Sequence, residues 1–591
     1  MKPFEPNTLT IAELFGNQDS FYKIPRYQRP YKWENEQVEQ LWDDIYTAYD
    51  ENINNYFLGS IITAKDGNSI DIIDGQQRMT TLMILFCVLR DLFPDINEDL
   101  DDPNVIDLET IENFIYYKKK HKRLTLLTDP QHRGDFEKLI IQGSVDNLKK
   151  PYKYEIRIDE KPKFKFINTA LIFKEKLLEL GKEKVGDFIN FLFHNVSIIR
   201  IDCIDKGFAI KLFQVLNDRG MDLTSSDLIK SFLLQKIEDK YKDEDVETDK
   251  KDEEDQFITN WRKAENILVD TDLTMNDMFI VYEYYILAQN PKKSLSDELQ
   301  DQFKDKDSNI VLQDFVDFCE IYRDKVFNNE NRVMYSFWYL RWSVYWKSIV
   351  LASLHNGYQE HDKLLELLRR FYYLYWISGK TLTKVKQLSF NLIKWVKENQ
   401  SITYIEQEIN TKIESDKILQ DATNNLTSED IYNTAWCKPL YLLIEYELTD
   451  DSKLSFIELS KDLHLEHILP KKYKNFKEWN HISDEVAYKW INSAGNLTLL
   501  SGAKNIEASN NPFSEKINVY KGKGRYDNKN NSITAFEMTK YIVYDYSSKK
   551  YDEEWTINAM EDRYDWFCNN VEKIINININ INIKERKEKK E

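Results

Sequence analysis

The sequence predicts an α+β protein of several domains. Its 591 residues are several times the usual domain length of roughly 100–200 residues. Only 16 glycines and 13 prolines interrupt the chain, which favours long helices over a β architecture with many turns. Short β-branched runs occur towards both ends, whereas the middle repeats apolar residues at helical spacing. Together these observations predict mixed α/β regions on either side of a helical middle.

Residues 1–240 are expected to form the first mixed region. YFLGSIITA (56–64) and NVSIIRIDC (195–203) have the length and the β-branched residues of strands. MTTLMILFCVLRDLF (79–93) has the length and apolar content of a buried helix. The following stretch, 241–256, is dense in charge and almost free of apolar residues, so we expect an exposed linker there.

Residues 257–450 are expected to form an aromatic-rich helical domain. Stretches such as MYSFWYLRWSVYWKSIVLASL repeat apolar residues at helical spacing, which is typical of a core, so no chemistry is assigned to them. Residues 451–574 return to a mixed texture and form the last expected domain. The tail, 575–591, is low in complexity and then charged, which predicts a frayed terminus.

The cysteine pattern and the apolar runs bound the class of protein. The five cysteines are scattered and contain no CxxC pair, which argues against a disulfide framework and a thiolate zinc site. The chain does not open with a basic segment followed by an apolar one, so no signal peptide is indicated. No run reaches the roughly 18 apolar residues of a membrane helix. We therefore expect a cytoplasmic protein without a membrane partner.

The net charge of −19 speaks against nucleic acid as a partner, but binding depends on local patches. Several basic clusters interleave lysine or arginine with tyrosine or phenylalanine, a mixture that suits phosphates and stacked bases. A solvated surface explains any single cluster at least as well. The clusters are 116–123, 149–165, 470–474 and 520–526.

A first set of candidate residues lies near the C-terminus. LHLEHILP (463–470) places Glu466 beside His467, and AGNLTLLSGAKNIEASN adds Asn496 and Asn505, nine positions apart. Phosphodiester hydrolysis needs a group that deprotonates water near neutral pH, and histidine has a suitable pKa. Carboxylate and amide oxygens are ligands that Mg²⁺ prefers. The Glu–His pair alone is better explained as a buried pair whose two side chains bond each other. The spaced asparagines shift the interpretation to a nuclease site.

This pattern resembles the His-Me finger (HNH) nuclease module, a ββα unit that folds around one divalent metal. The resemblance implies His467 as general base, Asn496 as the group that orients its imidazole, and Glu466 and Asn505 as ligands of Mg²⁺ (or Mn²⁺). Glu466 departs mildly from the family, in which this ligand is commonly Asp. His464 is interpreted as a neighbour on the same strand.

A second set of candidates is the run DGQQR, which follows an expected buried strand and opens an expected helix. Glycine lets the backbone approach a phosphate, and a helix N-terminus favours an anion. Arginine can bind phosphate bidentately, the two glutamines supply amides, and the aspartate could hold a metal or activate a water. A strand–turn–helix with polar capping explains DGQQR alone equally well. There is no Walker A sequence, which excludes a P-loop NTPase. The residues are Asp74, Gly75, Gln76, Gln77 and Arg78.

With IPRYQRPYKW, YFLGSIIT and FQVLNDRGMDLTSSDLIK, this run resembles the ParB/sulfiredoxin-like domain of GmrSD-type modification-dependent (type IV) restriction enzymes. That family carries a His-Me finger nuclease after this domain, in the order found here. The resemblance implies that DGQQR binds or hydrolyses a nucleoside triphosphate, with GTP, CTP and ATP left open. It also suggests nucleotide or DNA sensing by Tyr27, Gln28 and Arg29, and a turn packed against the same pocket. The turn residues are Asn217, Arg219 and Gly220.

These observations predict a nucleotide-dependent endonuclease that restricts foreign, modified double-stranded DNA by metal-assisted hydrolysis. The expected architecture is a ParB/sulfiredoxin-like N-terminal domain, a helical middle domain and a ββα-metal C-terminal domain. Two alternatives stay open: an RNA-cleaving abortive-infection toxin, and a nucleotide-switched DNA-binding protein without cleavage. The sequence also leaves a homodimer open.

Overall fold

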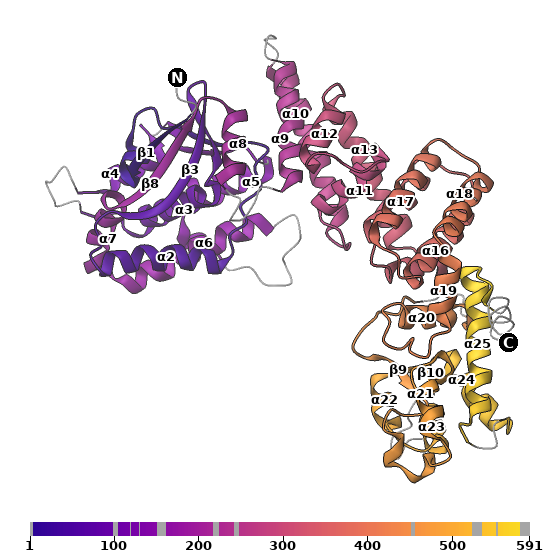
Figure 1. Ribbon diagram of the computed structural model, residues 1–591. Helices are drawn as coiled ribbons and strands as arrows, with labels where there is room; N and C mark the ends of the chain where they lie inside the picture. The colour runs from indigo at the N-terminus through magenta and orange to yellow at the C-terminus, as the bar shows by residue number, and fades with distance from the viewer. Residues whose placement is uncertain are drawn as a thin grey trace. The chain divides into compact units, whose positions relative to one another are not determined.

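The structure is a computed structural model, shown in Figure 1. It describes residues 4–97, 105–118, 120–128, 130–149, 161–216, 224–241, 247–450, 455–522, 535–550 and 554–579. The chain divides into two compact units. The N-terminal unit comprises Met1–Asn276 and Ser294–Val316, and the C-terminal unit comprises Asp277–Lys293 and Asp317–Glu591.

The N-terminal unit is built on a six-stranded sheet in the order β1-β8-β3-β4-β2-β7. The pairs β3–β8, β2–β4 and β2–β7 are parallel, whereas β1–β8 and β3–β4 are antiparallel. As a result, β2 and β4 end at one edge of the sheet, and β3 and β8 end at the opposite edge. The strands are β1 (Phe4–Thr10), β2 (Tyr22–Ile24), β3 (Tyr56–Asp66), β4 (Ser69–Asp74), β7 (Leu124–Leu126) and β8 (Val196–Cys203).

One face of this sheet packs on a layer of helices around the buried helix α3 (Figure 1). Ile61, Ile72 and Ile198 of the sheet belong to the same buried cluster as the apolar side chains of α3, because alternate strand residues face the same side. The helices that contribute to this cluster are α1 (Ile11–Gly16), α2 (Asn35–Asp50), α3 (Gln76–Leu92), α4 (Leu108–Ile115), α5 (Pro130–Phe136), α6 (Lys161–Leu180) and α7 (Lys182–His194), with η1 (Glu137–Ile141) and η2 (Val145–Asn147).

The other face carries α8 (Lys206–Leu216), which contacts β3, β4 and β8. Asp71 stands between Ile70 and Ile72 on β4, and both isoleucines pack in the cluster on the α3 side. The Asp71 carboxylate therefore points to the α8 side, where it lies 3.0 Å from the ammonium of Lys206. A small hairpin, β5 (Tyr116–Tyr117) and β6 (His121–Lys122), stands outside the main sheet. The unit is completed by α9 (Ser225–Lys240), α10 (Glu247–Leu268), α12 (Leu295–Phe303) and the first part of α13 (Ser308–Ile321).

The charged stretch that was expected to be a linker is largely helical, because α10 begins at Glu247. Its carboxylates find partners: Arg26, which follows β2, pairs with Glu254 at 3.0 Å and also with Asp255. Phe257 then starts the buried side of the same helix. Dense charge with few apolar residues predicted a linker, but ion pairs to a neighbouring segment stabilise a helix that the apolar pattern alone did not reveal.

The C-terminal unit begins with packed helices and ends in a mixed α/β module. The helical part confirms the expected aromatic core, with Trp346, Phe371 and Tyr373 at most 1% exposed. Its elements are α11 (Met275–Leu287), which spans the boundary, η5 (Tyr322–Phe327), α14 (Arg332–Trp338), α15 (Ser343–His355), α16 (His361–Ile377), α17 (Leu382–Lys397), α18 (Ile402–Ser415), α19 (Ile418–Leu426) and α20 (Cys437–Leu448).

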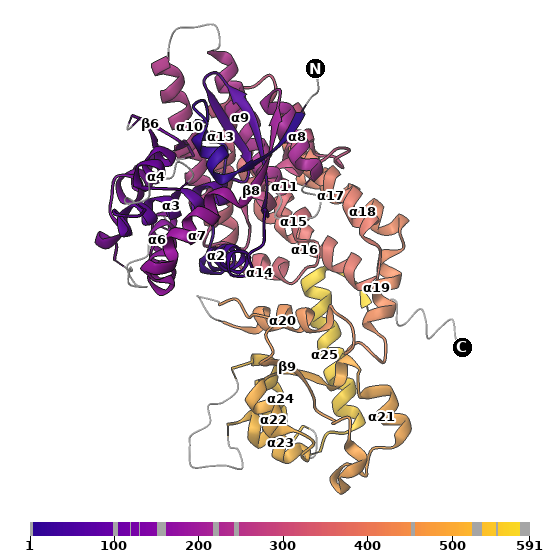
Figure 2. The same cartoon turned by 90° about the vertical axis from the view of Figure 1, so that its left-hand side faces the viewer.

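The mixed module packs around a two-stranded antiparallel sheet of β9 and β10 (Figure 2). Residues 575–579 of the expected frayed tail depart from that expectation, because Ile577 and Ile579 are buried. Among the helices that the structure describes, none combines the length and apolar character that crossing a membrane requires. The elements are β9 (Leu463–His467), η6 (Tyr473–Asn475), η7 (Lys477–Trp479), α21 (Asp484–Trp490), η8 (Ala494–Asn496), β10 (Leu497–Ser501), α22 (Gly502–Ala508), α23 (Phe513–Tyr520), α24 (Glu537–Ser547) and α25 (Ile557–Ile575).

Candidate catalytic and nucleotide-binding sites

The expected order of strand, strand and helix is present around His467. In the antiparallel pair, Glu466 lies opposite Thr498 and His467 lies opposite Leu497. Helix α22 follows β10 directly and contacts both strands. Because neighbouring strand residues face opposite sides, Glu466 and His467 point into different surroundings. The two side chains therefore have separate partners.

His467 is half-buried against residues that precede α20 and η8. Its Nε2 is 3.1 Å from Oδ1 of Asn492, and its ring centroid is 4.2 Å from that of Tyr432. Since an amide oxygen only accepts hydrogen bonds, this contact places the proton on Nε2 and leaves Nδ1 as an acceptor. Burial lowers the pKa of His467 to about 4, with help from the nearby charge of Lys471, so the imidazole is neutral at pH 7.

The amide of Asn496 is hydrogen-bonded to groups other than the imidazole, although the sequence predicted that it would orient the ring. Its Oδ1 accepts from the backbone N–H of Leu469 at 2.7 Å and from the indole N–H of Trp555 at 3.1 Å, and its Nδ2 donates to the Leu469 carbonyl at 2.9 Å. Asn496 thus fixes the chain just after His467, and Asn492 binds the ring. The sequence carries no signal for Asn492, because only the folded loop brings it to His467.

Glu466 is buried and forms an ion pair with Lys516 of α23, whose side chain is 0% exposed. The ammonium also donates to the backbone carbonyl of His467 at 2.7 Å. Burial raises the pKa of Glu466 and lowers the pKa of Lys516, while each charge opposes the shift of the other. The sequence did contain a signal for this pair, because Lys516 falls among the inward positions of α23 between Phe513 and Tyr520.

The expected ligand pair, Glu466 and Asn505, does not fit a divalent metal in this arrangement. The ammonium of Lys516 already neutralises the Glu466 carboxylate, and a second cation on the same buried group would be repelled. Asn505 lies on the side of α22 that carries the buried Gly502 and Ala508, which is the side packed on the strands. Within the described ranges, no group of three or more His, Cys, Asp or Glu side chains could hold a metal ion.

DGQQR occupies the turn from β4 into α3, as the sequence predicted. Asp74 ends the strand, and Gly75 caps the helix in the left-handed conformation, with φ of 88°. A Cβ at Gly75 would lie 2.4 Å from Cγ2 of Ile61 on β3, so only glycine fits this turn. The turn therefore brings the N-terminus of α3 close to the middle of the sheet.

Arg78 points back across β3. Its Nη1 donates to the carbonyl of Ser60 at 2.9 Å, and its guanidinium lies against the backbone of Gly59. Burial raises the pKa of Asp74 and lowers the pKa of Arg78, and Arg29 lies close enough to act on the same carboxylate. Two guanidinium groups beside a helix N-terminus form a site suited to phosphate oxygens.

The remaining expected sensing and nucleotide residues mostly hold the fold together. Gln77 accepts from the backbone N–H of Lys32 at 2.7 Å and donates to the Pro30 carbonyl at 3.2 Å, which anchors the segment after β2. Gln28 is buried and donates to the Ile73 carbonyl at 2.7 Å. Tyr27 is also buried, and its hydroxyl has no hydrogen-bond partner in the described part of the chain.

Arg29 remains half-buried, 3.7 Å from Asp227 of α9, and Gln76 is buried in the first turn of α3. Tyr27 and Gln28 thus lie inside the unit and expose little of their side chains, although Tyr27 lines a cavity together with Arg26 and Lys206. Their burial was not apparent from the sequence, because polar residues in a loop usually face solvent. The expected turn of Asn217, Arg219 and Gly220 lies outside the described residues.

The basic clusters have different environments. In the cluster 116–123, Lys118 and Lys120 are exposed, Arg123 is 1% exposed, and Lys119 lies outside the described residues. In the cluster 470–474, Lys471 lies over the ring of Tyr432, 4.1 Å from its centroid. Most of the other two clusters falls outside the described residues. Exposed charge of the described cluster residues thus includes Lys118 and Lys120 near the β5–β6 hairpin and Lys471 near His467.

Two family models match the chain, one for each candidate site. Residues 11–234 match the N-terminal domain of the GmrSD restriction endonuclease, and residues 415–570 match the C-terminal domain of GmrSD restriction endonucleases. DGQQR lies within the first match, and His467 lies within the second. No curated protein matches the chain.

Proposed function

The chain has the two-domain architecture of the GmrSD restriction endonucleases, and from this premise we propose that it is a nucleotide-dependent endonuclease that cleaves modified foreign DNA in phage defence. The observation that carries the proposal is the environment of His467. A neutral imidazole, fixed through Nε2 by Asn492, presents Nδ1 as a base within the matched C-terminal domain.

In the proposed reaction, Nδ1 of His467 takes a proton from the water that attacks a DNA phosphate. Burial keeps the imidazole unprotonated before DNA binds, because its pKa lies near 4. An anionic phosphate beside the ring favours the imidazolium and raises that pKa towards neutrality, which strengthens the base when substrate is present. Lys471, exposed beside Tyr432, is placed to contact the same phosphate backbone.

Two cofactors belong to the proposal. The guanidinium groups of Arg78 and Arg29 and the N-terminus of α3 support binding of a nucleoside triphosphate through its phosphates. Mg²⁺ or Mn²⁺ is proposed on the family resemblance, and a divalent ion would stabilise charge that develops on the phosphate. Since Lys516 holds Glu466, such an ion would need ligands other than the Glu466 carboxylate in this arrangement.

Digestion of one phage DNA in modified and unmodified forms, with and without nucleotide and Mg²⁺, tests the proposal. The expected result is cleavage of modified DNA that requires nucleotide and is lost in His467→Ala. Arg78→Ala is expected to weaken nucleotide binding and cleavage together, whereas Arg26→Ala, at a guanidinium paired with α10, is a matched control. Cleavage of RNA alone would support the toxin, and binding without cleavage would support the switch.

A further inference from the structure

A concavity of the N-terminal unit lies at the edge of the sheet opposite to DGQQR. It has a volume of about 1460 Å³ and is bordered by the loop before β2, the β3–β4 turn, the end of β8 and the β5–β6 hairpin. DGQQR follows the C-terminal end of β4, whereas Ser69 and Ile70 at the start of β4 line the concavity. The two sites are therefore separated by the length of that strand.

Three aromatic rings form one wall of this concavity. Phe21 makes edge-type contacts with Tyr117 and with His121, each at a centroid distance of 5.9 Å. Tyr117 and His121 are direct cross-strand partners in the β5–β6 hairpin, so their side chains share one face of it. Tyr117 and Phe21 are half-buried and His121 is exposed. The ammonium of Lys118 and the guanidinium of Arg123 lie over the Tyr117 ring, 5.0 Å and 4.7 Å from its centroid, so a stacking base shares that ring with these cations and uses the exposed His121 ring.

Arg123 makes this wall rigid. It is 1% exposed, and its guanidinium lies 5.3 Å from the ring centroid of Phe21 and 4.7 Å from that of Tyr117. The same group donates to the carbonyls of Asn17 and Ser20, which belong to the loop on the adjoining side of the concavity. Both sides are thus tied to one buried cation and stand preorganised without a ligand.

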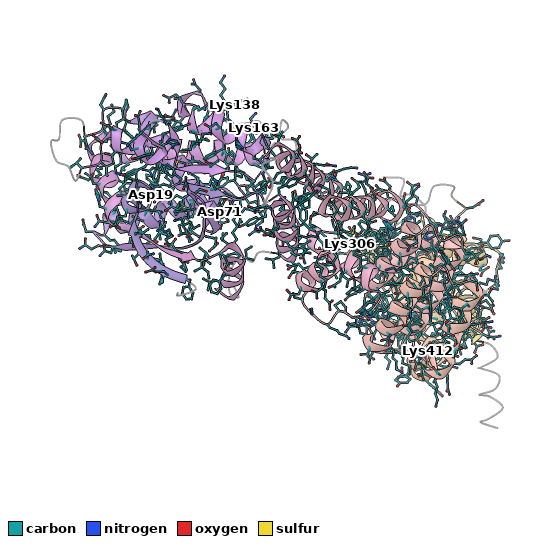
Figure 3. All side chains as sticks on the ribbon, turned by 90° about the horizontal axis from the view of Figure 1, so that it is seen from above. Asp19, Asp71, Lys138, Lys163, Lys306 and Lys412 are labelled. Carbon is teal, nitrogen blue, oxygen red and sulfur yellow. The ribbon has the colours of Figure 1, made fainter. Side chains whose placement is uncertain are left out.

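The concavity is lined by charges of both signs, namely Lys23, Lys65 and Arg200 and the carboxylates of Asp19, Asp66 and Asp202. Arg200 is engaged by Asp202 at 3.0 Å and is largely neutralised. Lys23 is half-buried and Lys65 is exposed, and both line the concavity. The exposed Asp19 lies on the loop side and is labelled in Figure 3. Ammonium groups can contact phosphates, while carboxylate and amide groups can read a base edge.

We propose that this concavity receives a nucleotide turned out of duplex DNA and reads its base, a proposal that rests on the function above. Stacking on the Tyr117 and His121 rings requires an unstacked base, which duplex DNA supplies only when a nucleotide is everted. The volume exceeds the 300–1,000 Å³ that is typical of small-molecule pockets. The excess leaves room for a base that carries a bulky substituent.

Fluorescence of 2-aminopurine, which rises when its neighbour leaves the stack, tests the proposal without any cleavage. The probes are duplexes with 2-aminopurine beside cytosine, 5-hydroxymethylcytosine or glucosylated 5-hydroxymethylcytosine, bound by the full chain as His467→Ala. We expect a fluorescence rise with at least one modified probe. Tyr117→Ala should remove the rise and weaken binding of that probe by roughly 5- to 150-fold, the range for loss of one stacked base.

Matched variants separate the outcomes. Tyr488→Ala, at a tyrosine that is 81% exposed in the C-terminal unit, should behave as the reference protein. Lys65→Glu, which alters no packed side chain, should weaken all three probes alike.

Equal fluorescence and affinity in Tyr117→Ala and the reference would overturn the pocket while leaving the endonuclease intact. Displacement of the duplex signal by free nucleoside triphosphate in Arg78→Ala, whose DGQQR site is impaired, would also overturn it, because the occupant of the concavity would be a mononucleotide. Failure of the proposed function has a separate sign: wild-type protein that cuts no DNA.

Discussion

Two histidines on β9 allow the catalytic assignment to be tested at the scale of single residues. His464 and His467 are three positions apart and face opposite sides of the strand, and His467 is hydrogen-bonded to Asn492. We expect His467→Ala to reduce DNA cleavage by roughly 10²- to 10⁴-fold, the usual effect of losing a general base. Asn492→Ala should cost roughly tenfold, because one hydrogen bond that orients the ring is lost. Initial rates on a plasmid substrate measure both effects.

His464→Ala serves as the control and should retain a rate within a few-fold of wild type. Cleavage by His467→Ala at the wild-type rate would exclude this histidine as the base. Circular dichroism of each variant distinguishes a lost base from a lost fold.

The pair of Lys516 and Glu466 provides a second test at this scale. Lys516→Met leaves a buried carboxylate without its counter-charge, and we expect a loss of about 3–5 kcal/mol in the free energy of unfolding. Adding Glu466→Gln should recover part of this loss, because the remaining group is then neutral. Urea unfolding monitored by tryptophan fluorescence gives the comparison.

The exposed pair of Lys474 and Asp484 is the matched control for this test, and Lys474→Met should leave the unfolding curve unchanged. A Lys516→Met protein as stable as wild type would contradict a stabilising role for the buried pair.

The sequence located the candidate residues more reliably than it identified their partners. Strand alternation places Glu466 and His467 on opposite sides of β9. The partners of each side chain come from segments far along the chain, such as Asn492 and Lys516, and depend on how loops fold. A local pattern gives no distance between such segments, so the exchange of Asn496 for Asn492 could not be predicted.

At the scale of elements, the turn from β4 into α3 depends on one glycine. Gly75→Ala places a Cβ against Ile61 and forces alanine into a left-handed conformation, so we expect a loss of roughly 2–5 kcal/mol in unfolding free energy. Gly67, in the β3–β4 turn, also has a positive φ of 56° but meets no atom within 4 Å of a built Cβ. Gly67→Ala should therefore cost only roughly 1–2 kcal/mol.

Thermal unfolding of both variants measures the difference, and nucleotide affinity measures whether Gly75→Ala also disturbs the helix terminus. Equal losses in the two variants would mean that the contact with Ile61 is relieved by a small shift of β3.

The elements themselves were predicted unevenly. Strands β3 and β8 and helix α3 were evident because their apolar runs match the residue periods of a strand and a buried helix. Helix α10 was missed because its carboxylates are stabilised by Arg26 and Lys240, which the charge run does not reveal. The burial of Tyr27 and Gln28 was missed for a similar reason, since a hydrogen bond from Gln28 to Ile73 holds a polar loop inside.

At the scale of the whole molecule, a net charge of −19 must be reconciled with a DNA partner. If a few basic patches contact phosphates, the logarithm of the binding constant should fall with the logarithm of salt by about 0.9 per contact. We expect Lys118→Glu/Lys120→Glu to weaken modified and unmodified duplexes alike and to reduce this slope by about one per lysine. Fluorescence anisotropy over a series of salt concentrations gives both values.

The control changes charge equally at exposed lysines of the C-terminal unit, as Lys325→Glu/Lys412→Glu. If both double variants weaken binding by the same factor, net charge governs affinity and the hairpin has no special role.

Strand β3 joins the two proposed sites of the N-terminal unit. It receives the hydrogen bond of Arg78 at Ser60, beside an irregularity in its pairing with β8, and it ends at Lys65 and Asp66 in the concavity. A ligand that moves Arg78 therefore acts on one end of β3, and the other end of this strand borders the proposed site of the DNA base.

Thermodynamic linkage then makes the coupling reciprocal: whatever factor nucleotide adds to DNA affinity, DNA must add to nucleotide affinity. For a coupling of ordinary strength, roughly 5- to 150-fold, titrations in both orders should return the same factor. A factor of one in both orders would mean that β3 transmits nothing. A shared factor above one would make the nucleotide an effector that raises the affinity of the protein for a duplex whose base occupies the concavity.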